Sequence, residues 1–163
     1  MTGFLRTTVL WVLVAFVGET IVAPLIDIRG IAPDFAIIAL VLLGLAAGPI
    51  PATVGGFGLG LVQDLANPAL LGLNALCKTG LGFLVGRARG RLVYGLPAVE
   101  VAVLVTAVVA HDVVFLLVQS RLSDDAFLTP LLTRTLPVAL YTGLVGVPVI
   151  RLAELFGILG RED

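Results

Sequence analysis

The hydrophobic positions of this chain form long unbroken runs instead of alternating with polar ones. One stretch of 29 residues, from Phe35 to Gln63, has no ionisable side chain, and a Gly-Pro-Ile-Pro turn at 48–51 divides it. Asp34 precedes the stretch and Asp64 follows it. A helix on the surface of a water-soluble domain needs a polar face, which this stretch does not offer. The pattern therefore predicts a membrane hairpin with an acidic residue at each end.

Six apolar segments follow from the same pattern, and we expect them to form one transmembrane domain over residues 1–163. Their expected bounds are 4–26, 32–47, 52–66, 70–86, 97–120 and 135–156. The second and third are short, because about 16 residues at ~1.5 Å each give ~24 Å against a hydrocarbon core of ~30 Å. They either cross with local thinning of the bilayer or form a re-entrant hairpin, and both alternatives stay open. The fold class predicted is an all-α integral membrane protein built as a six-helix bundle.

The arginines predict the orientation of these segments. If the N-terminus is inside, the cytoplasmic parts hold Arg6, Arg87, Arg89, Arg91, Arg151 and Arg161, and the opposite side holds Arg29, Arg121 and Arg134. Positive charge close to helix ends favours the cytoplasmic side of a membrane. We therefore expect a multi-pass protein with both termini in the cytoplasm.

Composition supports the membrane class and leaves little room for catalysis. The chain is 59% hydrophobic and 13% charged, whereas an ordinary globular domain is about 25% charged. A net charge of −1 provides no basic surface for nucleic acid. A zinc site takes three or four ligands of His, Cys or carboxylate type, and a chain with one histidine and one cysteine argues against such a site. The sequence has neither the Gly-x-Ser-x-Gly motif of a nucleophilic serine nor the Gly-x-x-x-x-Gly-Lys-Ser/Thr motif of a phosphate-binding loop. We therefore expect no catalytic, cofactor-binding or metal-binding residues.

Glycine is frequent, with 19 residues, and six of the glycines form pairs four residues apart. Such spacing places both members of a pair on one helix face, where neighbouring backbones can approach closely. The pairs predict tight packing of the second to fourth segments. The expected helix-packing residues are Gly44, Gly48, Gly56, Gly60, Gly82 and Gly86.

A few polar residues fall inside the predicted spans, in their middle or outer parts. A charge at the centre of a membrane helix costs ~2.5–3.5 kcal/mol on insertion scales, so each one needs a partner or a wet site. We expect one buried polar cluster made of Glu19, Asp64, Asn74, Lys78, His111 and Asp112. Its structural interpretation is a salt-bridge network, most simply Lys78 with Asp64 or Asp112. Its functional interpretation is an ion pathway or a binding pocket open to the outside.

The expected outer loop, 121–134, contains two aspartates together with Phe127 and several leucines. A solvated connection does not need these apolar residues. They are expected either to lie in the membrane interface as a short amphipathic helix or to contact another protein.

Three short motifs between 31 and 91 resemble the MreD family of rod shape-determining proteins. The first is Ala-Pro-Asp-Phe at 32–35, the second a glycine-rich run closing on Asp-Leu at 55–65, and the third Gly-Leu-Asn-Ala-Leu at 72–76. The positions that carry the likeness are Pro33, Asp34, Phe35, Gly56, Gly60, Asp64, Gly72 and Asn74. The second half of the chain agrees with the family in hydropathy alone.

The resemblance implies a non-enzymatic protein of the bacterial inner membrane that belongs to the cell-elongation (rod) complex. Members of the family bind MreC directly. They act in one complex with the filament protein MreB, the glycosyltransferase RodA and a class B penicillin-binding protein, and so support cell shape and peptidoglycan synthesis. The family is also similar in fold to the S components of energy-coupling-factor transporters. This likeness provides the alternative function, the binding of a small vitamin-type molecule for a transporter.

Overall fold

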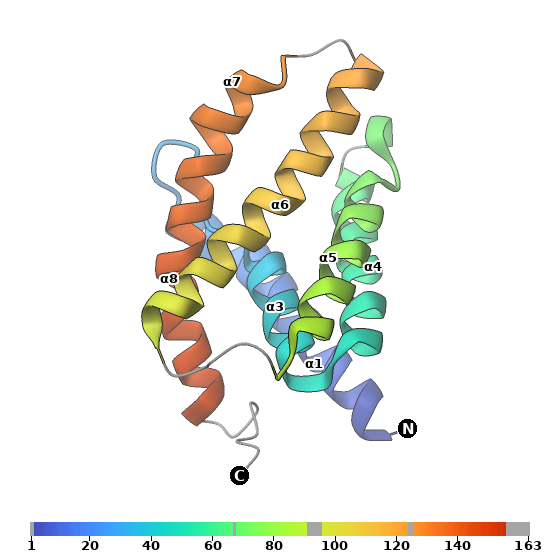
Figure 1. The fold of residues 1–163 in the computed structure, drawn as a ribbon, viewed down its shortest axis with the longest axis vertical. Helices are drawn as coiled ribbons and strands as arrows, with labels where there is room; N and C mark the ends of the chain where they lie inside the picture. Colours follow the sequence, from blue (N-terminus) through green and yellow to red (C-terminus); the bar gives the residue numbers. More distant parts are fainter. Residues whose placement is uncertain (1, 67, 91–95, 124–125, 156–163) are drawn as a thin grey trace.

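The computed structural model describes residues 2–66, 68–90, 96–123 and 126–155 of the chain. Over these residues the chain forms six helical runs, as the hydrophobic pattern predicts (Figure 1). The first run joins α1 (Thr2–Val17), the π-helical turn η1 (Gly18–Val22) and α2 (Ala23–Leu25). Next come α3 (Phe35–Ala47), α4 (Pro49–Ala66), the short 3-10 turn η2 (Pro68–Leu70) and α5 (Leu73–Ala88). The fifth run is α6 (Pro97–Ser123), and the sixth joins α7 (Leu128–Pro130), η3 (Leu131–Thr135) and α8 (Leu136–Leu155).

The last run begins earlier than the sequence indicates, at Leu128 and not near 135. The preceding helix α6 also continues to Ser123. Most of the expected loop 121–134 is therefore helical. Pro130 lies in the first turn of the new helix, where a missing backbone N–H is not needed for a hydrogen bond. The leucines of this segment thus lie in the first turns of a long helix. Residues 124–125 lie outside the described part of the chain.

Two of the described helical runs are long and apolar enough to cross a membrane, Pro97–Leu122 and Leu128–Leu155. Two shorter apolar helices, Trp11–Leu25 and Phe35–Ala47, accompany them. These lengths and compositions fit an integral membrane protein. In the view of Figure 1, the end of the bundle with η2 and α7 is called the upper end, and the end with the α3–α4 turn the lower end.

Two helical runs contain a π-helical turn, and each turn ends just before a proline. In η1 the N–H of Ala23 bonds to the carbonyl of Gly18, five residues back, and Pro24 follows. In η3 the N–H of Leu136 bonds to the carbonyl of Leu131, and Pro137 follows. Proline has no N–H for the regular helix ladder, so the local hydrogen bonding shifts. These turns alter the direction in which the polar side chains on them point.

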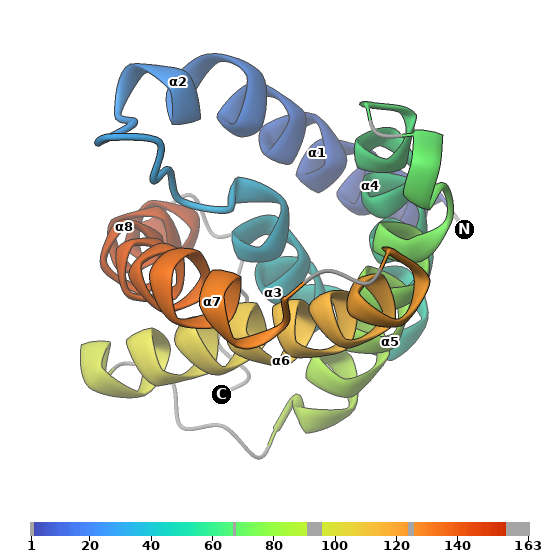
Figure 2. The ribbon, with the colours of Figure 1, turned by 90° about the horizontal axis from the view of Figure 1, so that it is seen from above.

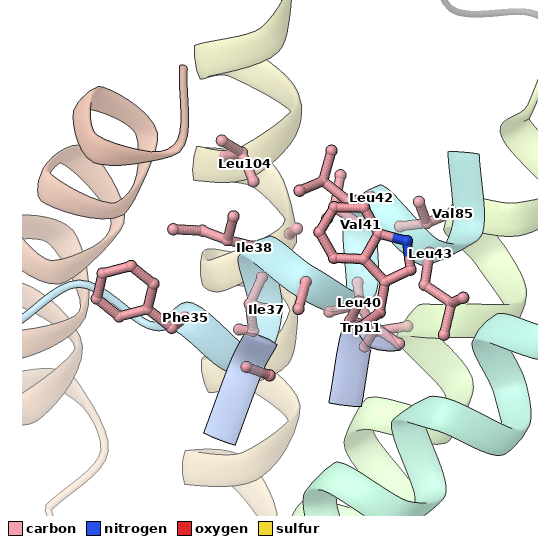
Figure 3. Packing of buried hydrophobic residues seen from close by; sticks show 14 of the residues in the cluster. Trp11, Phe35, Ile37, Ile38, Leu40, Val41, Leu42, Leu43, Val85 and Leu104 are labelled. Atoms are coloured by element: carbon pink, nitrogen blue, oxygen red, sulfur yellow. The ribbon is translucent and has the colours of Figure 1, made fainter. Parts of the chain in front are cut away.

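Helix α3 forms the centre of the bundle. Its residues from Phe35 to Leu45 are all buried, although it is only 13 residues long. Seen from above, the other long helices surround it (Figure 2). Trp11 of α1, Val85 of α5 and Leu104 of α6 reach its side chains from different directions (Figure 3). Burial on every side explains why this segment has no polar face.

Helices α4 and α5 pack backbone to backbone through the predicted glycine pairs. A methyl group on Gly56 would overlap the Lys78 carbonyl, and one on Gly60 would overlap the backbone of Ala75. Gly82 and Gly86 lie equally close to the backbone of α4 in return. Gly44 extends this contact to α3, because a methyl there would lie 2.9 Å from Val85 Cγ1. Gly48 has a different role, since its φ of 87° forms the turn between α3 and α4.

Helices α6 and α8 form a second pair that closes over α3. A methyl group on Gly146 of α8 would overlap the side chain of Leu104 on α6, so the two helices pack closely at this point. At the lower end Arg151 of α8 bonds to the buried carboxylate of Glu100 on α6, at 2.9 Å. At the other end of α8 the Tyr141 hydroxyl donates to the Ile26 carbonyl, 2.7 Å away, and so connects α8 to the end of α2.

Candidate functional site

A cavity of about 840 Å³ opens at the upper end of the bundle. Residues of η1, α2, α4, α5, α6, α7, η3 and α8 line it, and its floor lies just before the first turn of α3, at Pro33 and Asp34. The cause is the unequal length of the helices. At 1.5 Å per residue, α3 extends for about 20 Å and α6 for about 40 Å, so α3 leaves the space above its first turn empty.

Asp34 begins α3 and also faces this cavity. Its Oδ1 accepts a hydrogen bond of 2.7 Å from the N–H of Ile37, so the side chain caps the helix. Its own N–H donates to Thr142 Oγ1 of α8 at 3.0 Å. Its second oxygen lies 3.8 Å from Lys78 Nζ. One aspartate of the family motif thus connects α3, α5 and α8.

Lys78 is almost completely buried, with 1% of its side chain exposed. Its ammonium lies between the Asp34 carboxylate and His111 Nε2, which is 3.2 Å away. The expected pairing of Lys78 with Asp64 or Asp112 is therefore wrong. The short α3 is the reason, because it brings its capping aspartate to the depth of Lys78.

His111 continues this network towards the last helical run. An ammonium can only donate, so Nε2 of His111 accepts from Lys78, and Nδ1 carries the proton. Nδ1 then donates to Asp112 Oδ1 at 2.9 Å, and Thr135 of η3 donates to Asp112 Oδ2 at 2.7 Å. The ring of Phe115 stacks on the imidazole at 6.0 Å. The chain of bonds connects α5, α6 and the π-helical turn η3.

Asp64 is fully buried, but it belongs to a different arrangement from the one expected. Its carboxylate accepts three backbone hydrogen bonds, from Gly72 at 2.9 Å and from Asn74 and Ala75 at 3.0 Å. It therefore caps the N-terminus of α5, whose entry at Gly72 has a φ of 95°. This explains the order of the family motif, in which an aspartate precedes Gly-Leu-Asn by eight residues. Asp64 does not line the cavity, whereas Asn74 does.

Glu19 faces the cavity from the π-helical turn η1. Its Oε1 receives one long hydrogen bond, 3.4 Å from Gln63 Nε2 of α4. Its Oε2 is buried and has no hydrogen-bond partner among the described residues. The backbone N–H groups of Phe35 and Ala36, at the beginning of α3, also lie close to this carboxylate, so its unused acceptor capacity is confined to Oε2.

The structure thus brings five of the six expected cluster residues to one cavity and places the sixth, Asp64, at a helix cap. Asp34, Gln63 and Thr135 also belong to the network, although the sequence pattern did not predict them there. Asp34 was recognised as part of a motif, and its place just before an apolar helix was the available signal. Among the described residues, no group of three or more His, Cys, Asp or Glu side chains could hold a metal ion.

A family model described as rod shape-determining protein MreD matches residues 2–156. The match extends through α6 and α8, the half of the chain in which no short motif resembled the family. Comparisons with curated proteins and with solved structures gave no match. The family consists of shape-determining membrane proteins that are not known as enzymes. The chain belongs to the MreD family of rod shape-determining proteins.

Proposed function

We propose that this protein is a non-enzymatic inner-membrane subunit of the cell-elongation complex that binds MreC directly. Membership of the family implies a role in determining rod shape. The observation that carries the binding role is the charged cavity at the upper end, which is open and lined by side chains from nearly every helix. Through MreC, we expect the protein to act with MreB, RodA and the class B penicillin-binding protein.

We further propose that the upper end of the bundle faces away from the cytoplasm. Arg87, Arg89 and Arg151 all lie at the lower end of their helices, where the positive-inside rule places the cytoplasm. Both termini then lie in the cytoplasm. In this orientation the cavity opens to the outer surface of the membrane.

A bitopic partner fits this arrangement. Its single membrane helix would pack on an exposed apolar face of the bundle, and the segment leaving that helix would emerge beside the cavity mouth. Four acids line the cavity, Glu19, Asp27, Asp34 and Asp112, against two bases, Lys78 and Arg134. With His111 neutral and all four acids ionised, the lining has a net charge of −2, which favours a basic segment over an acidic one.

The bonding of the interior polar groups supports a binding role over a catalytic one. Lys78 is engaged by two neighbours, and both Asp112 oxygens accept hydrogen bonds. Asp64 is occupied by three backbone amides. These groups fix the helices relative to one another and shape the cavity.

Co-purification from membranes tests the proposal. Tagged protein should retain MreC through size-exclusion chromatography in mild detergent. Ala32→Trp, which fills part of the cavity, should weaken retention. Ala102→Trp on the exposed face of α6 serves as the control, since the same enlargement there leaves the cavity unchanged. A well-expressed wild-type protein that never retains MreC would contradict the proposal.

The cavity volume also favours a second candidate, the binding of a small molecule as in a transporter S component. About 840 Å³ lies within the ~300–1,000 Å³ typical of ligand pockets. Apart from His111, Phe115 is the aromatic residue among the described lining, so few rings are available to stack on a vitamin-type ligand. Native mass spectrometry of purified protein distinguishes the two functions. A bound small molecule that is lost in Asp112→Ala would favour the transporter role.

A further inference from the structure

Glu19 differs from the other interior acids of the cavity in its bonding. Asp34 uses one oxygen to cap α3 and directs the other to Lys78. Asp112 accepts from both His111 and Thr135. Glu19 receives a 3.4 Å bond from Gln63 and lies near the backbone N–H groups of Phe35 and Ala36, but its buried Oε2 has no hydrogen-bond partner among the described residues. A buried carboxylate oxygen that accepts no hydrogen bond destabilises the fold. This position therefore favours a ligand that brings a hydrogen-bond donor.

The backbone that carries Glu19 points to the same place. Glu19 lies on η1, and Arg134 and Thr135 lie on η3, so the two π-helical turns both contribute polar side chains to one cavity. Short π-helical turns within α-helices occur frequently at functional sites. The two π-helical turns η1 and η3, together with the unsatisfied Glu19 carboxylate oxygen, indicate a site that binds a hydrogen-bond donor.

We propose that Glu19 binds a cationic side chain, a lysine or an arginine, from the juxtamembrane segment of the partner. This inference rests on the proposed function, because it assigns the residue that recognises the partner. The net charge of −2 in the cavity attracts a cation, and the Glu19 carboxylate offers it an acceptor. A charge-assisted hydrogen bond then satisfies Oε2.

The ammonium of a phospholipid headgroup would be the other source of a cation. Such a headgroup brings a phosphate with it, which requires a second cation nearby. Lys78 is the deeply buried base of the cavity, and Asp34 and His111 already engage its ammonium. A side chain from a protein brings positive charge alone, so it fits the interior better.

The experiment measures the affinity of full-length MreC for the protein in nanodiscs of phosphatidylglycerol and phosphatidylcholine, which contain no primary amine. Glu19→Gln keeps the shape of the side chain and removes its charge. We expect it to raise the Kd by about 10- to 100-fold, as the loss of one charge-assisted bond predicts. Glu154→Gln makes the same chemical change at the lower end of α8 and should leave the Kd within about twofold of wild type.

The reciprocal experiment changes the partner one basic juxtamembrane residue at a time, to glutamine, against wild-type protein. One of these variants should lose as much affinity as Glu19→Gln, and combining the two should add little further loss. This arm does not depend on whether the Glu19 variant folds. Gel filtration and protection of the Cys77 thiol confirm folding for the variants in the first arm.

The outcomes separate the inference from the function on which it rests. If wild type binds MreC and neither Glu19→Gln nor any partner variant changes the Kd, the role of Glu19 is wrong and the docking stands. If the loss appears only in nanodiscs containing phosphatidylethanolamine, a lipid amine occupies the site and the inference is overturned. If wild type does not bind MreC, both the proposed function and the inference fail.

Discussion

Replacing Asp64 by alanine removes the single side chain that caps α5 inside the membrane. Three backbone N–H groups, those of Gly72, Asn74 and Ala75, lose their acceptor at once. Each buried donor left without a partner costs about 1–3 kcal/mol, and part of this is recovered if the first turn of α5 rearranges. We therefore expect a loss of about 3–6 kcal/mol in the free energy of unfolding. Asp64→Asn keeps one carbonyl acceptor, so its loss should be smaller.

The chain contains its own reporter for this change. Cys77 is the one cysteine of the sequence, lies on α5 just after the cap, and is 7% exposed. Heating in the presence of a thiol-reactive fluorescent dye measures the temperature at which α5 becomes accessible. For a domain of this size about 1 kcal/mol corresponds to ~2–4 °C, so Asp64→Ala should melt roughly 10–20 °C lower than wild type.

Asp27→Ala is the matched control for this experiment. Asp27 is exposed and accepts one backbone hydrogen bond, from Gly30 at 2.7 Å. Its removal should cost less than about 1 kcal/mol, because water replaces an exposed partner. An Asp64→Ala protein that melts within about 2 °C of wild type would refute the assignment of Asp64 as a buried helix cap.

The same thiol assay tests three further predictions. Lys78→Ala should cost about 3–5 kcal/mol, because it strips the cation from a carboxylate in the interior, and adding Asp34→Asn should restore part of the loss. Full additivity in that double variant would show that the two residues do not interact. Gly60→Ala should destabilise strongly by pushing α4 away from α5, whereas Gly58→Ala meets open space and should be neutral or stabilise by up to ~1 kcal/mol. Equal melting temperatures for the two variants would contradict the close contact. Arg29→Asn should raise the melting temperature slightly, since Arg29 has a φ of 57°, a conformation that asparagine adopts at lower cost; a lower value would argue against strain there.

The helices and their glycine contacts were predictable because they depend on local pattern. Long apolar runs mark the helices, and glycines four residues apart mark one face, whatever the neighbours are. The π-helical turns were not predicted, although Pro24 and Pro137 inside apolar runs were a usable signal. The early beginning of the last run at Leu128 was missed because its first turn tolerates Pro130.

The partners of the interior charges could not be predicted in the same way. Which carboxylate meets Lys78 depends on how deep each helix begins, and that depth is set by packing across the whole bundle. Asp34 reaches Lys78 because α3 begins part of the way down, and Asp64 does not because backbone amides occupy it. Sequence spacing could predict that these charged residues lie in one region, but it could not predict which carboxylate pairs with Lys78.

The close glycine contact between α4 and α5 has a consequence for biogenesis. Helix α4 is not one of the two runs that are apolar and long enough to cross by themselves, since it contains four glycines, two prolines and an aspartate. Once α5 has been synthesised, its backbone contact with α4 therefore provides packing that α4 lacks by itself.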